Sequence, residues 1–496
     1  MSSRPVNLDK LFNPRGVAVV GATTNITKWG FTIFHNIVNN NYSGGLYPVN
    51  INPSITEIFG FKVYRSILDI PQDQPLDLVI IVIPAKYVLQ VFEQCKQRNV
   101  KAVVVISAGF KEHGGEGIEL ENKLKAYAQA HGIRFVGPNG MGICAMQTNL
   151  IAVMWPTKDL KQGGLSLASQ SGNIGTIGIS IASQRGIGLN NFVSVGNMAD
   201  LDICDYLEYF GEKDDNTKII GLYVEGIEDG RRFINLCKRI SKKKPIIILK
   251  RGGGGESARK AAISHTGAIS GSDELFKALV KSAGAIFVDS LDEMFDLTLA
   301  FQRWDVKHYK FQNKKVVILT LGGGWGVMTA DACDKYNIEL VDLPPEAINR
   351  IDEMLPPYWS KGNPIDTVAL LDLKVIGKIL TILLQEVPEA DAIFLLGIGG
   401  MGYVAKMART SPYINEENLK ILDFGAMMEE NLFENVLTLS AEWKKAIFIT
   451  SLLTPEISSA IAYLKEENYP VFTSPDKMVR CYVHITDYMK WCAQNV

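Results

Sequence analysis

The sequence has almost no net charge, few cysteines and no long apolar run. Its 51 basic and 53 acidic residues leave a formal charge of −2, so the positive surface that binds nucleic acid is not expected. No apolar run reaches the roughly 18 residues that a transmembrane helix requires, so no membrane contact is expected either. The 7 cysteines form no CxxC pair, which indicates reduced thiols rather than disulfides or a metal site.

The N-terminus also lacks the apolar core of a signal peptide, and we therefore expect a cytoplasmic protein. What the sequence does contain is enough apolar material for large cores. The chain has 496 residues, of which 47% are hydrophobic, and this length suits about three domains.

Strands alternate with helical segments along the whole chain, which predicts an α/β fold with doubly wound parallel sheets. We place the domains at residues 1–150, 151–308 and 309–496. In such sheets, ligands bind beyond the carboxyl ends of the strands. The residues that follow the expected strands are therefore the candidates for function.

Small and polar residues follow the expected strands of the first domain. They are Gly21, Asn50, Pro84, Ser107 and Asn139. Only one glycine after the first strand is in register with a GxGxxG motif, and no acidic residue closes the second strand. These absences disfavour an NAD-dependent dehydrogenase without excluding it, and a different phosphate-bearing nucleotide fits better.

Two features of the second domain indicate phosphoryl chemistry. Ser171, Gly172 and Asn173 stand at a strand–helix junction, where free amides and the helix dipole favour an anion. His265 follows a run of four glycines, and a neutral imidazole is a nucleophile that can carry a phosphoryl group. Glu225 closes a neighbouring strand and could accept the second N–H of that ring. An ordinary turn, a structural histidine and a surface carboxylate remain open on these residues alone.

The third domain repeats the pattern of the second. A shift of 151 residues places the expected strand 165–168 on 316–319, while Glu225 falls opposite Ile398 and no histidine corresponds to His265. The same shift places Gly172 on Gly323, Gly175 on Gly326 and Ile187 on Ile338. Further along, at larger offsets, Gly196-Asn197 matches Gly362-Asn363, and Lys244 matches Lys445. One copy keeps the expected chemistry, and the other keeps a glycine-rich helix start at which Gly323 and Gly324 could approach a phosphate.

The chain also carries an ordered set of motifs that match one enzyme family. They are VAVVGAT (17–23), YPVN (47–50), ISAGF (106–110), GPNGMG (137–142), SQSGNIG (169–175), VSVGNMADLD (193–202), YVEGIEDGRRF (223–233), SHTGAISGSD (264–273), GGGWGV (322–327), NPID (363–366) and YPVFTSPDKMV (469–479). With these motifs the chain resembles the NDP-forming acyl-CoA synthetases, relatives of succinyl-CoA synthetase. The resemblance is closest to the alpha subunit of ADP-forming acetate–CoA ligase.

The resemblance implies a Rossmann-like coenzyme A-binding domain followed by two flavodoxin-like domains. It implies an acid–CoA ligase that converts acyl-CoA, ADP and phosphate reversibly to a carboxylic acid, ATP and coenzyme A through acyl phosphate and a phosphohistidine. His265 matches the phosphorylated histidine, and Glu225 matches the carboxylate that supports it. The matching phosphate-binding residues are Ser171, Gly172 and Asn173, and the coenzyme A loops contain Gly21, Thr23, Asn50, Pro84 and Ser107, with Asn139 near the thiol end.

The resemblance also implies a partner, because the family's ATP-grasp module has no counterpart in the sequence. We expect it on a separate beta subunit, which would hold Mg-ADP or Mg-ATP in an α2β2 heterotetramer. Two residues depart from the family's usual pattern: Gly140 follows GPN where the family usually has cysteine or serine, and Trp325 interrupts the third-domain stretch that usually reads Asn-Ala-Gly-Gly-Pro-Gly. These departures leave the carboxylic acid undecided and keep an inactive coenzyme A-binding regulatory protein as an alternative. The choice of ADP or GDP and the physiological direction also stay open.

Overall fold

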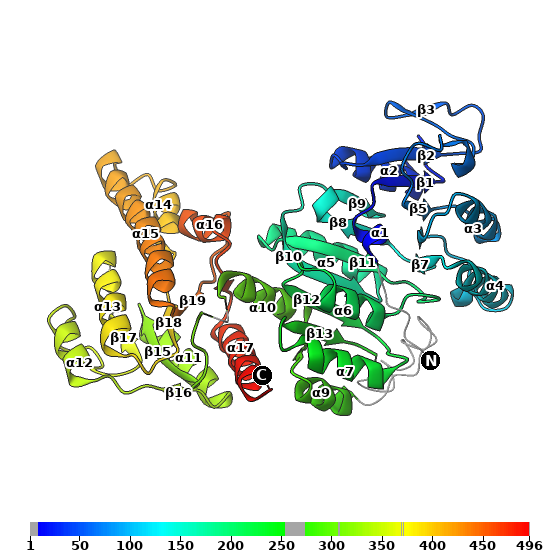
Figure 1. Cartoon of the computed structure of the whole chain (residues 1–496). Helices are drawn as coiled ribbons and strands as arrows, with labels where there is room; N and C mark the ends of the chain where they lie inside the picture. Colours follow the sequence, from blue (N-terminus) through cyan, green and yellow to red (C-terminus); the bar gives the residue numbers. More distant parts are fainter. Residues whose placement is uncertain (1–7, 253–272, 306–307, 369, 371, 496) are drawn as a thin grey trace. The chain divides into compact units, whose positions relative to one another are not determined.

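The computed structural model describes residues 8–252, 273–305, 308–368, 370 and 372–495. It divides into two compact units, Met1–Met294 and Phe295–Val496 (Figure 1). Unit 1 contains two large sheets and unit 2 contains one. Within the described ranges, no helix is both long enough and apolar enough to cross a membrane.

The first sheet is parallel, with the strand order β2-β1-β5-β6-β7. Its strands are almost continuous buried apolar runs, as expected for a parallel sheet that is covered on both faces. The strands are β1 (Gly16–Val20), β2 (Gly45–Val49), β5 (Leu78–Ile81), β6 (Ala102–Val105) and β7 (Arg134–Val136), with the hairpin β3 (Glu57–Ile58) and β4 (Phe61–Lys62) beside them. The helices are α1 (Asp9–Phe12), α2 (Trp29–Asn39), α3 (Val88–Gln97) and α4 (Glu116–His131).

The second sheet has the order β14-β13-β12-β10-β11-β8-β9. Its strands are β8 (Gly142–Ala145), β9 (Leu150–Val153), β10 (Gln162–Ser169), β11 (Leu189–Ser194), β12 (Ile219–Val224), β13 (Ile246–Lys250) and β14 (Ile286–Val288). The helices are α5 (Gly172–Gln184), α6 (Ile203–Glu212), α7 (Gly230–Ile240), α9 (Asp273–Ser282) and α10 (Leu291–Arg303). Strand β8 lies within the residues that the sequence assigns to the first domain, but it pairs antiparallel with β11.

The third sheet has the order β16-β15-β18-β19-β20, with β17 also paired to β15. Its strands are β15 (Lys315–Thr320), β16 (Glu339–Leu340), β17 (Ile365–Asp366), β18 (Ala392–Leu396), β19 (Ala446–Thr450) and β20 (Val471–Phe472). The helices are α11 (Gly323–Lys335), α12 (Pro345–Asp352), α13 (Leu373–Glu386), α14 (Met401–Ala408), α15 (Glu416–Trp443), α16 (Ser459–Glu466) and α17 (Pro475–Asn495).

All three sheets share one order of parallel strands, 2-1-3-4-5 when each sheet is counted from its own first parallel strand. In this doubly wound order, the second strand is added on one side of the first strand, and the third and later strands are added on the other side. Ligands bind at this switch point, between the first and third strands. The switch points lie between β1 and β5, between β10 and β12, and between β15 and β18. The α/β fold class predicted from the sequence is confirmed.

The internal repeat is confirmed in its main part. Helices α5 and α11 both have 13 residues and start at Gly172 and Gly323, which the shift of 151 residues superimposes. After these helices, the N–H of Ile187 bonds the carbonyl of Ala182 at 2.9 Å, as the N–H of Ile338 bonds that of Cys333. The turn is the same in both copies.

One predicted pair is wrong. Gly196-Asn197 follows β11, whereas Gly362-Asn363 comes before β17. The side chain of Asn363 lies along β15, where it accepts from the N–H of Ile318 and donates to the carbonyl of Val316, both at 3.0 Å. The difference arises because two short strands, β16 and β17, stand where the second sheet has the single strand β11.

Candidate functional site

The residues predicted to hold coenzyme A gather at one edge of the first sheet. Each follows the carboxyl end of a strand, and Thr23 lies in the loop after β1. In strand order they are Asn50 after β2, Gly21 after β1, Pro84 after β5, Ser107 after β6 and Asn139 after β7. Their shared position is the one at which doubly wound sheets bind ligands.

The loops after β1, β2 and β5 are packed tightly together. The side-chain amide of Asn50 donates to the carbonyl of Ala22 at 2.7 Å and accepts from the N–H of Asn52 at 2.9 Å. Gly21 has a φ of +101°, and a Cβ there would lie 2.3 Å from the carbonyl oxygen of Val82. Only glycine fits this turn without strain, and it lets the backbone form the floor of the switch point.

Two of the predicted hydroxyl ligands bond to nearby backbone in this structure. Ser107 is buried, and its Oγ accepts from the N–H of Ile83 at 3.2 Å, which ties β6 to the end of β5. The Oγ1 of Thr23 accepts from the N–H of Asn25 at 3.2 Å. Both side chains therefore shape the loops, and a direct contact with coenzyme A stays a prediction for each.

The loop of the GPNGMG motif brings the first sheet's edge to the start of α5. Asn139 is exposed, with a φ of +60°, and its side-chain nitrogen lies 3.4 Å from Oδ1 of Asn197. The N–H of Met141 donates to Oγ of Ser194 at 2.8 Å. A Cβ on Gly172 would lie 2.2 Å from Cγ of Met141, so this loop touches the first residue of α5.

Gly140 occupies a crowded point of the same loop. A Cβ built there would lie 2.8 Å from the carbonyl oxygen of Ser194, closer than real Cβ atoms come to backbone. The departure from the family's cysteine or serine at Gly140 therefore fits this backbone path.

The start of α5 offers backbone amides to an anion. Ser171 stands at the N-cap, and its side chain makes no capping bond to the helix. The hydroxyl of Ser169 instead donates to the carbonyl of Ser171 at 2.7 Å, and this hydrogen bond fixes the turn into the helix. Gly172 follows half-buried and Asn173 exposed. A helix of 13 residues with an uncapped N-terminus attracts a phosphate through its free N–H groups and its dipole.

Gln170 was not singled out from the sequence, yet it organises this edge. Its Oε1 accepts from the N–H groups of Glu225 and of Gly226, the latter at 3.0 Å. Its Nε2 donates to the carbonyl of Gly226 at 2.7 Å. Gln170 and Glu225 are both only 8% exposed. Its place within the SQSGNIG motif was the available signal, and the partner loop is 55 residues away in sequence.

His265 lies outside the described residues, but the two ends of its segment are well placed. Lys250, the last residue of β13, forms an ion pair with Asp273, the first residue of α9. The N–H of Arg251 bonds the carbonyl of Val224 at 3.0 Å, next to Glu225. Lys250, Arg251 and Asp273 therefore lie at the same sheet edge as Glu225 and the start of α5.

The second glycine-rich helix start has different neighbours. The position that a Cβ would take on Gly323 lies 3.0 Å from Oδ2 of Asp366, so a carboxylate already stands beside this N-terminus. A Cβ built on Gly397, at the switch point of the third sheet, would lie 3.3 Å from Cδ1 of Trp325 and 3.4 Å from Cβ of Leu321. The carboxylate and the apolar side chains suit an anion less well than the start of α5. Phosphate binding at Gly323 and Gly324 stays a prediction.

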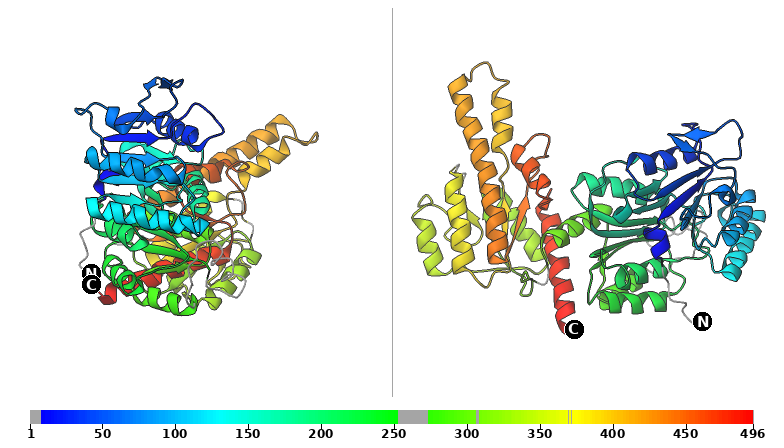
Figure 2. Two further views of the ribbon diagram at one scale, coloured as in Figure 1. Left: turned by 90° about the vertical axis from the view of Figure 1, so that its right-hand side faces the viewer. Right: turned by 45° about the horizontal axis from the view of Figure 1, so that its top comes forward.

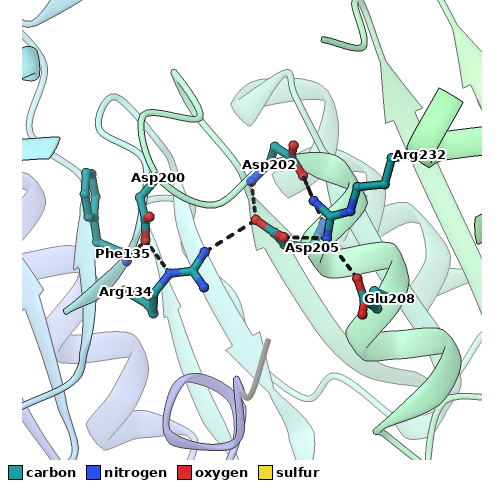
Figure 3. Close-up of polar contacts among 7 residues, drawn as sticks. All are labelled: Arg134, Phe135, Asp200, Asp202, Asp205, Glu208 and Arg232. Carbon is teal, nitrogen blue, oxygen red and sulfur yellow. Dashed lines mark hydrogen bonds and ion pairs between the residues drawn. The ribbon is translucent and has the colours of Figure 1, made fainter. Parts of the chain in front are cut away.

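A charged network joins the two sheets of unit 1 beside this edge (Figure 3). Asp200, in the VSVGNMADLD motif, accepts from Nε of Arg134 at 2.8 Å and from the N–H of Phe135 at 3.0 Å. Arg134 also lies 3.5 Å from Asp205, which pairs with Arg232 at 2.8 Å. The motif thus links β7 of the first sheet to α6 and α7 of the second.

Comparison with known families places each sheet in a described domain. Residues 15–146 match the CoA binding domain, 162–301 the succinyl-CoA ligase like flavodoxin domain, and 316–372 the ligase-CoA domain. Each match overlaps mainly one sheet: the first also includes β8 of the second sheet, and the third covers β15, β16 and β17 but not β18, β19 or β20.

Whole-chain relatives cover all three sheets. The chain is 36% identical to the alpha subunit of acetate–CoA ligase [ADP-forming] I of Pyrococcus furiosus over 99% of both chains. It is 40% identical to the alpha subunit of isoenzyme II from that organism, over 78% of this chain and 82% of the relative. The acetyl-coenzyme A synthetase 1 of Ca. Korarchaeum cryptofilum, solved with phosphate and ADP, has a TM-score of 0.81 and 30% identity over 98% of both chains. From these similarities, the chain belongs to the family of NDP-forming acyl-CoA synthetases.

Proposed function

We propose that this chain is the alpha-type subunit of an NDP-forming acyl-CoA synthetase. It would convert acyl-CoA, ADP and phosphate reversibly to a carboxylic acid, ATP and coenzyme A. One observation carries the proposal: the loop of Asn139 packs directly on the start of α5, at the edge where Gln170 holds Glu225. A thioester at the first sheet and a phosphate at the second would therefore meet at one place.

In the first step, phosphate held by the amides of Ser171, Gly172 and Asn173 attacks the carbonyl carbon of the thioester. The C–S bond breaks, and coenzyme A leaves as acyl phosphate forms. The amides at the start of α5 offset the charge of the attacking phosphate, as preorganised backbone donors do in other phosphoryl sites.

In the second step, neutral His265 attacks the phosphorus of acyl phosphate. The bond from phosphorus to the acyl oxygen breaks, and the carboxylate leaves. Glu225 would accept the N–H of the other ring nitrogen, which stabilises the charge that develops on the ring. Gln170 is a positioning residue in this scheme, because it fixes the backbone that carries Glu225.

In the last step, the phosphoryl group passes from His265 to ADP on a partner subunit. Relatives of this chain are named alpha subunits, which implies a separate beta partner. We propose that this partner carries an ATP-grasp module and the magnesium nucleotide, in an α2β2 heterotetramer. The two Pyrococcus furiosus relatives are named acetate–CoA ligases, and a carboxylic acid is proposed here as the substrate without a choice among acids.

The test is coexpression with a candidate ATP-grasp subunit, followed by a panel of acids in a thioester assay. We expect thioester formation that requires ATP, coenzyme A and one class of acid. His265→Asn should abolish both turnover and the acid-labile phosphate label on this chain. Full turnover by His265→Asn would contradict the phosphohistidine.

The alternatives give different results in the same preparation. A regulatory protein would bind coenzyme A in a titration but turn over no acid and take no label from ATP. A dehydrogenase would bind NAD rather than coenzyme A. Either result would overturn the proposed ligase.

A further inference from the structure

Two loops of unit 1 meet where the first sheet, coloured blue to cyan, adjoins the second, coloured green (Figure 2). They are residues 137–140, after β7, and residues 196–199, after β11. The N–H of Asn197 bonds the carbonyl of Pro138 at 2.8 Å. Gly196 has a φ of +59°, and a Cβ there would lie 2.1 Å from the carbonyl oxygen of Pro138. The two backbones are therefore in direct contact, which only a glycine permits.

The backbone of Asn139 is fixed in the first of these loops, but its side chain is exposed. Its N–H bonds the carbonyl of Ser107 at 3.0 Å, and its φ of +60° is a left-handed conformation that asparagine tolerates. Among the described residues, its side-chain nitrogen has one partner, Oδ1 of Asn197 at 3.4 Å. The orientation of the Asn139 amide therefore depends on Asn197.

Two carboxylates fix the direction in which the amide of Asn197 points. Its Nδ2 donates to Oε2 of Glu112 at 2.6 Å and to Oε2 of Glu121 at 2.8 Å. Glu121 lies on α4 and is only 7% exposed. Ionised carboxylates only accept hydrogen bonds, so both N–H groups of Asn197 face them. Oδ1 of Asn197 must then face Asn139.

This direction decides what Asn139 offers to a ligand. Oδ1 of Asn197 can only accept, so Nδ2 of Asn139 faces it and Oδ1 of Asn139 points away from it. Within the part of the chain that the structure describes, no donor bonds that oxygen. It is therefore an oriented acceptor for an N–H group. Glu112 and Glu121 would repel a phosphate nearby, so an uncharged amide fits this end of the loop.

We propose that Asn197 is a positioning residue, which directs Oδ1 of Asn139 toward an amide N–H in the pantetheine arm of coenzyme A. The inference rests on the proposed function, because it requires the thiol end of coenzyme A to reach this loop. Asn197 lies outside residues 15–146, which match the CoA binding domain, and inside residues 162–301, which match the flavodoxin domain. The second domain thus contributes to binding a ligand of the first.

The test is calorimetric titration of the full chain with two ligands, coenzyme A and adenosine bisphosphate, the nucleotide part of coenzyme A without its pantetheine arm. We expect Asn197→Ala and Asn139→Ala each to weaken coenzyme A binding about 10-fold, the scale of one lost hydrogen bond. The double variant should lose no more than either single variant, because both remove the same contact. All three variants should bind the bisphosphate as the wild type does.

Asn40→Ala is the matched control. Asn40 is half-buried like Asn197, and its Nδ2 also donates to two acceptors, the carbonyls of Asn36 at 2.8 Å and Thr157 at 2.9 Å. It caps the C-terminal end of α2, away from the carboxyl ends of the strands. This variant loses as many hydrogen bonds, yet it should bind both ligands normally.

Asn197→Asp is a second variant, which keeps the shape of the side chain but places a third carboxylate beside Glu112 and Glu121. It should weaken coenzyme A binding as Asn197→Ala does. The proposal is overturned if Asn197→Ala binds coenzyme A normally, if its loss multiplies with that of Asn139→Ala, if bisphosphate binding falls equally, or if Asn40→Ala has the same effect. With its partner subunit, a wild-type chain that showed the expected binding pattern but turned over no acid would overturn the proposed ligase alone.

Discussion

The junctions β10–α5 and β15–α11 have the same hydrogen bond at the start of the helix but different side chains around it. In each, the hydroxyl of the last strand residue holds a carbonyl at the helix start, Ser169 to Ser171 at 2.7 Å and Thr320 to Gly322 at 3.0 Å. The residue that follows the last strand residue differs between the two junctions. In the first it is the buried Gln170, whose side chain bonds the backbone of the loop that carries Glu225. The second has a leucine at the equivalent position, Leu321.

The register of the strands extends the comparison to the neighbouring loop. Ser169 pairs with Tyr223 as Thr320 pairs with Leu396, so Glu225 and Ile398 occupy equivalent places two residues later. Ile398 is 3% exposed. The duplicated fold thus keeps the helix start in both copies, while the buried glutamine and the glutamate that it positions are present in one. A glycine-rich helix start is therefore not enough to assign a phosphate site.

Exchanging the equivalent residues Gln170 and Leu321 should have the largest effect, on the rate of phosphate labelling. Gln170→Leu leaves the N–H groups of Glu225 and Gly226 without their acceptor, so Glu225 loses its fixed position. We expect labelling of the chain by ATP and its partner to slow about 100-fold, the usual cost of removing one polar group from a preorganised site. Acid-labile phosphate is the measured quantity.

The matched control for this exchange is Leu321→Gln, which should label at the normal rate. Melting curves of both variants separate a positioning effect from unfolding. Equal loss of labelling in the two variants would contradict the difference drawn between the junctions.

Alanine at the equivalent glycines should have an intermediate effect. A Cβ on Gly175 would lie 2.8 Å from both Ser169 Cβ and the Phe192 ring, so the helix must shift. A Cβ on Gly326 would meet Pro364 and Thr320 at 3.3 and 3.4 Å, which small movements relieve. We expect Gly175→Ala to destabilise by about 2 kcal/mol and Gly326→Ala by less than about 1 kcal/mol. Urea unfolding followed by circular dichroism measures both, and equal losses would refute the ranking.

The smallest difference concerns two equivalent lysines. Lys244, before β13, donates to the carbonyls of Phe210 and Asp214, both at 2.8 Å, while Lys445, before β19, donates to that of Val387 at 2.8 Å. Lys244→Met should cost about 2 kcal/mol and Lys445→Met about 1 kcal/mol, because two carbonyls lose a donor in one case and one in the other. Chemical unfolding at neutral pH is the test, and the reverse order would contradict it.

These lysines also give a pH dependence. Burial lowers the pKa of Lys244 and of Lys445 in the folded chain. As the pH rises from each lowered pKa toward the ordinary lysine value, the folded chain binds fewer protons than the unfolded one. Stability contributed by these groups therefore rises with pH in that window. The free-energy gap between the wild type and each methionine variant should widen there, and a narrowing gap would show the opposite shift.

The sequence predicted what depends on local pattern. Apolar runs such as 78–81 and 246–249 became buried strands, and the repeat placed Gly172 and Gly323 at equivalent helix starts. Long-range partners were not predictable in this way. Gln170 meets a loop 55 residues away, and Asp366 comes beside Gly323 only because β17 pairs with the end of β15. No local periodicity encodes either contact.

The role of the Ser107 hydroxyl was also not predictable from the sequence. A polar residue at a strand end suits a ligand or a neighbouring loop equally well in sequence, and in the structure it bonds the backbone of Ile83. Strand β8 likewise gave no local sign that it would leave the first sheet for the second. Which element a short apolar run joins is decided by packing between segments distant in sequence.

The ionic joint between Arg134 and Asp200 has a consequence for engineering. A cut between the two family domains, after residue 146 and before residue 162, would leave Asp200 and Asp205 without Arg134. A chimera that imports a foreign CoA binding domain at that boundary must bring its own guanidinium or leave Asp200 without its arginine, whereas Asp205 keeps its ion pair with Arg232. The smallest segment that keeps this ion pair therefore includes both family domains.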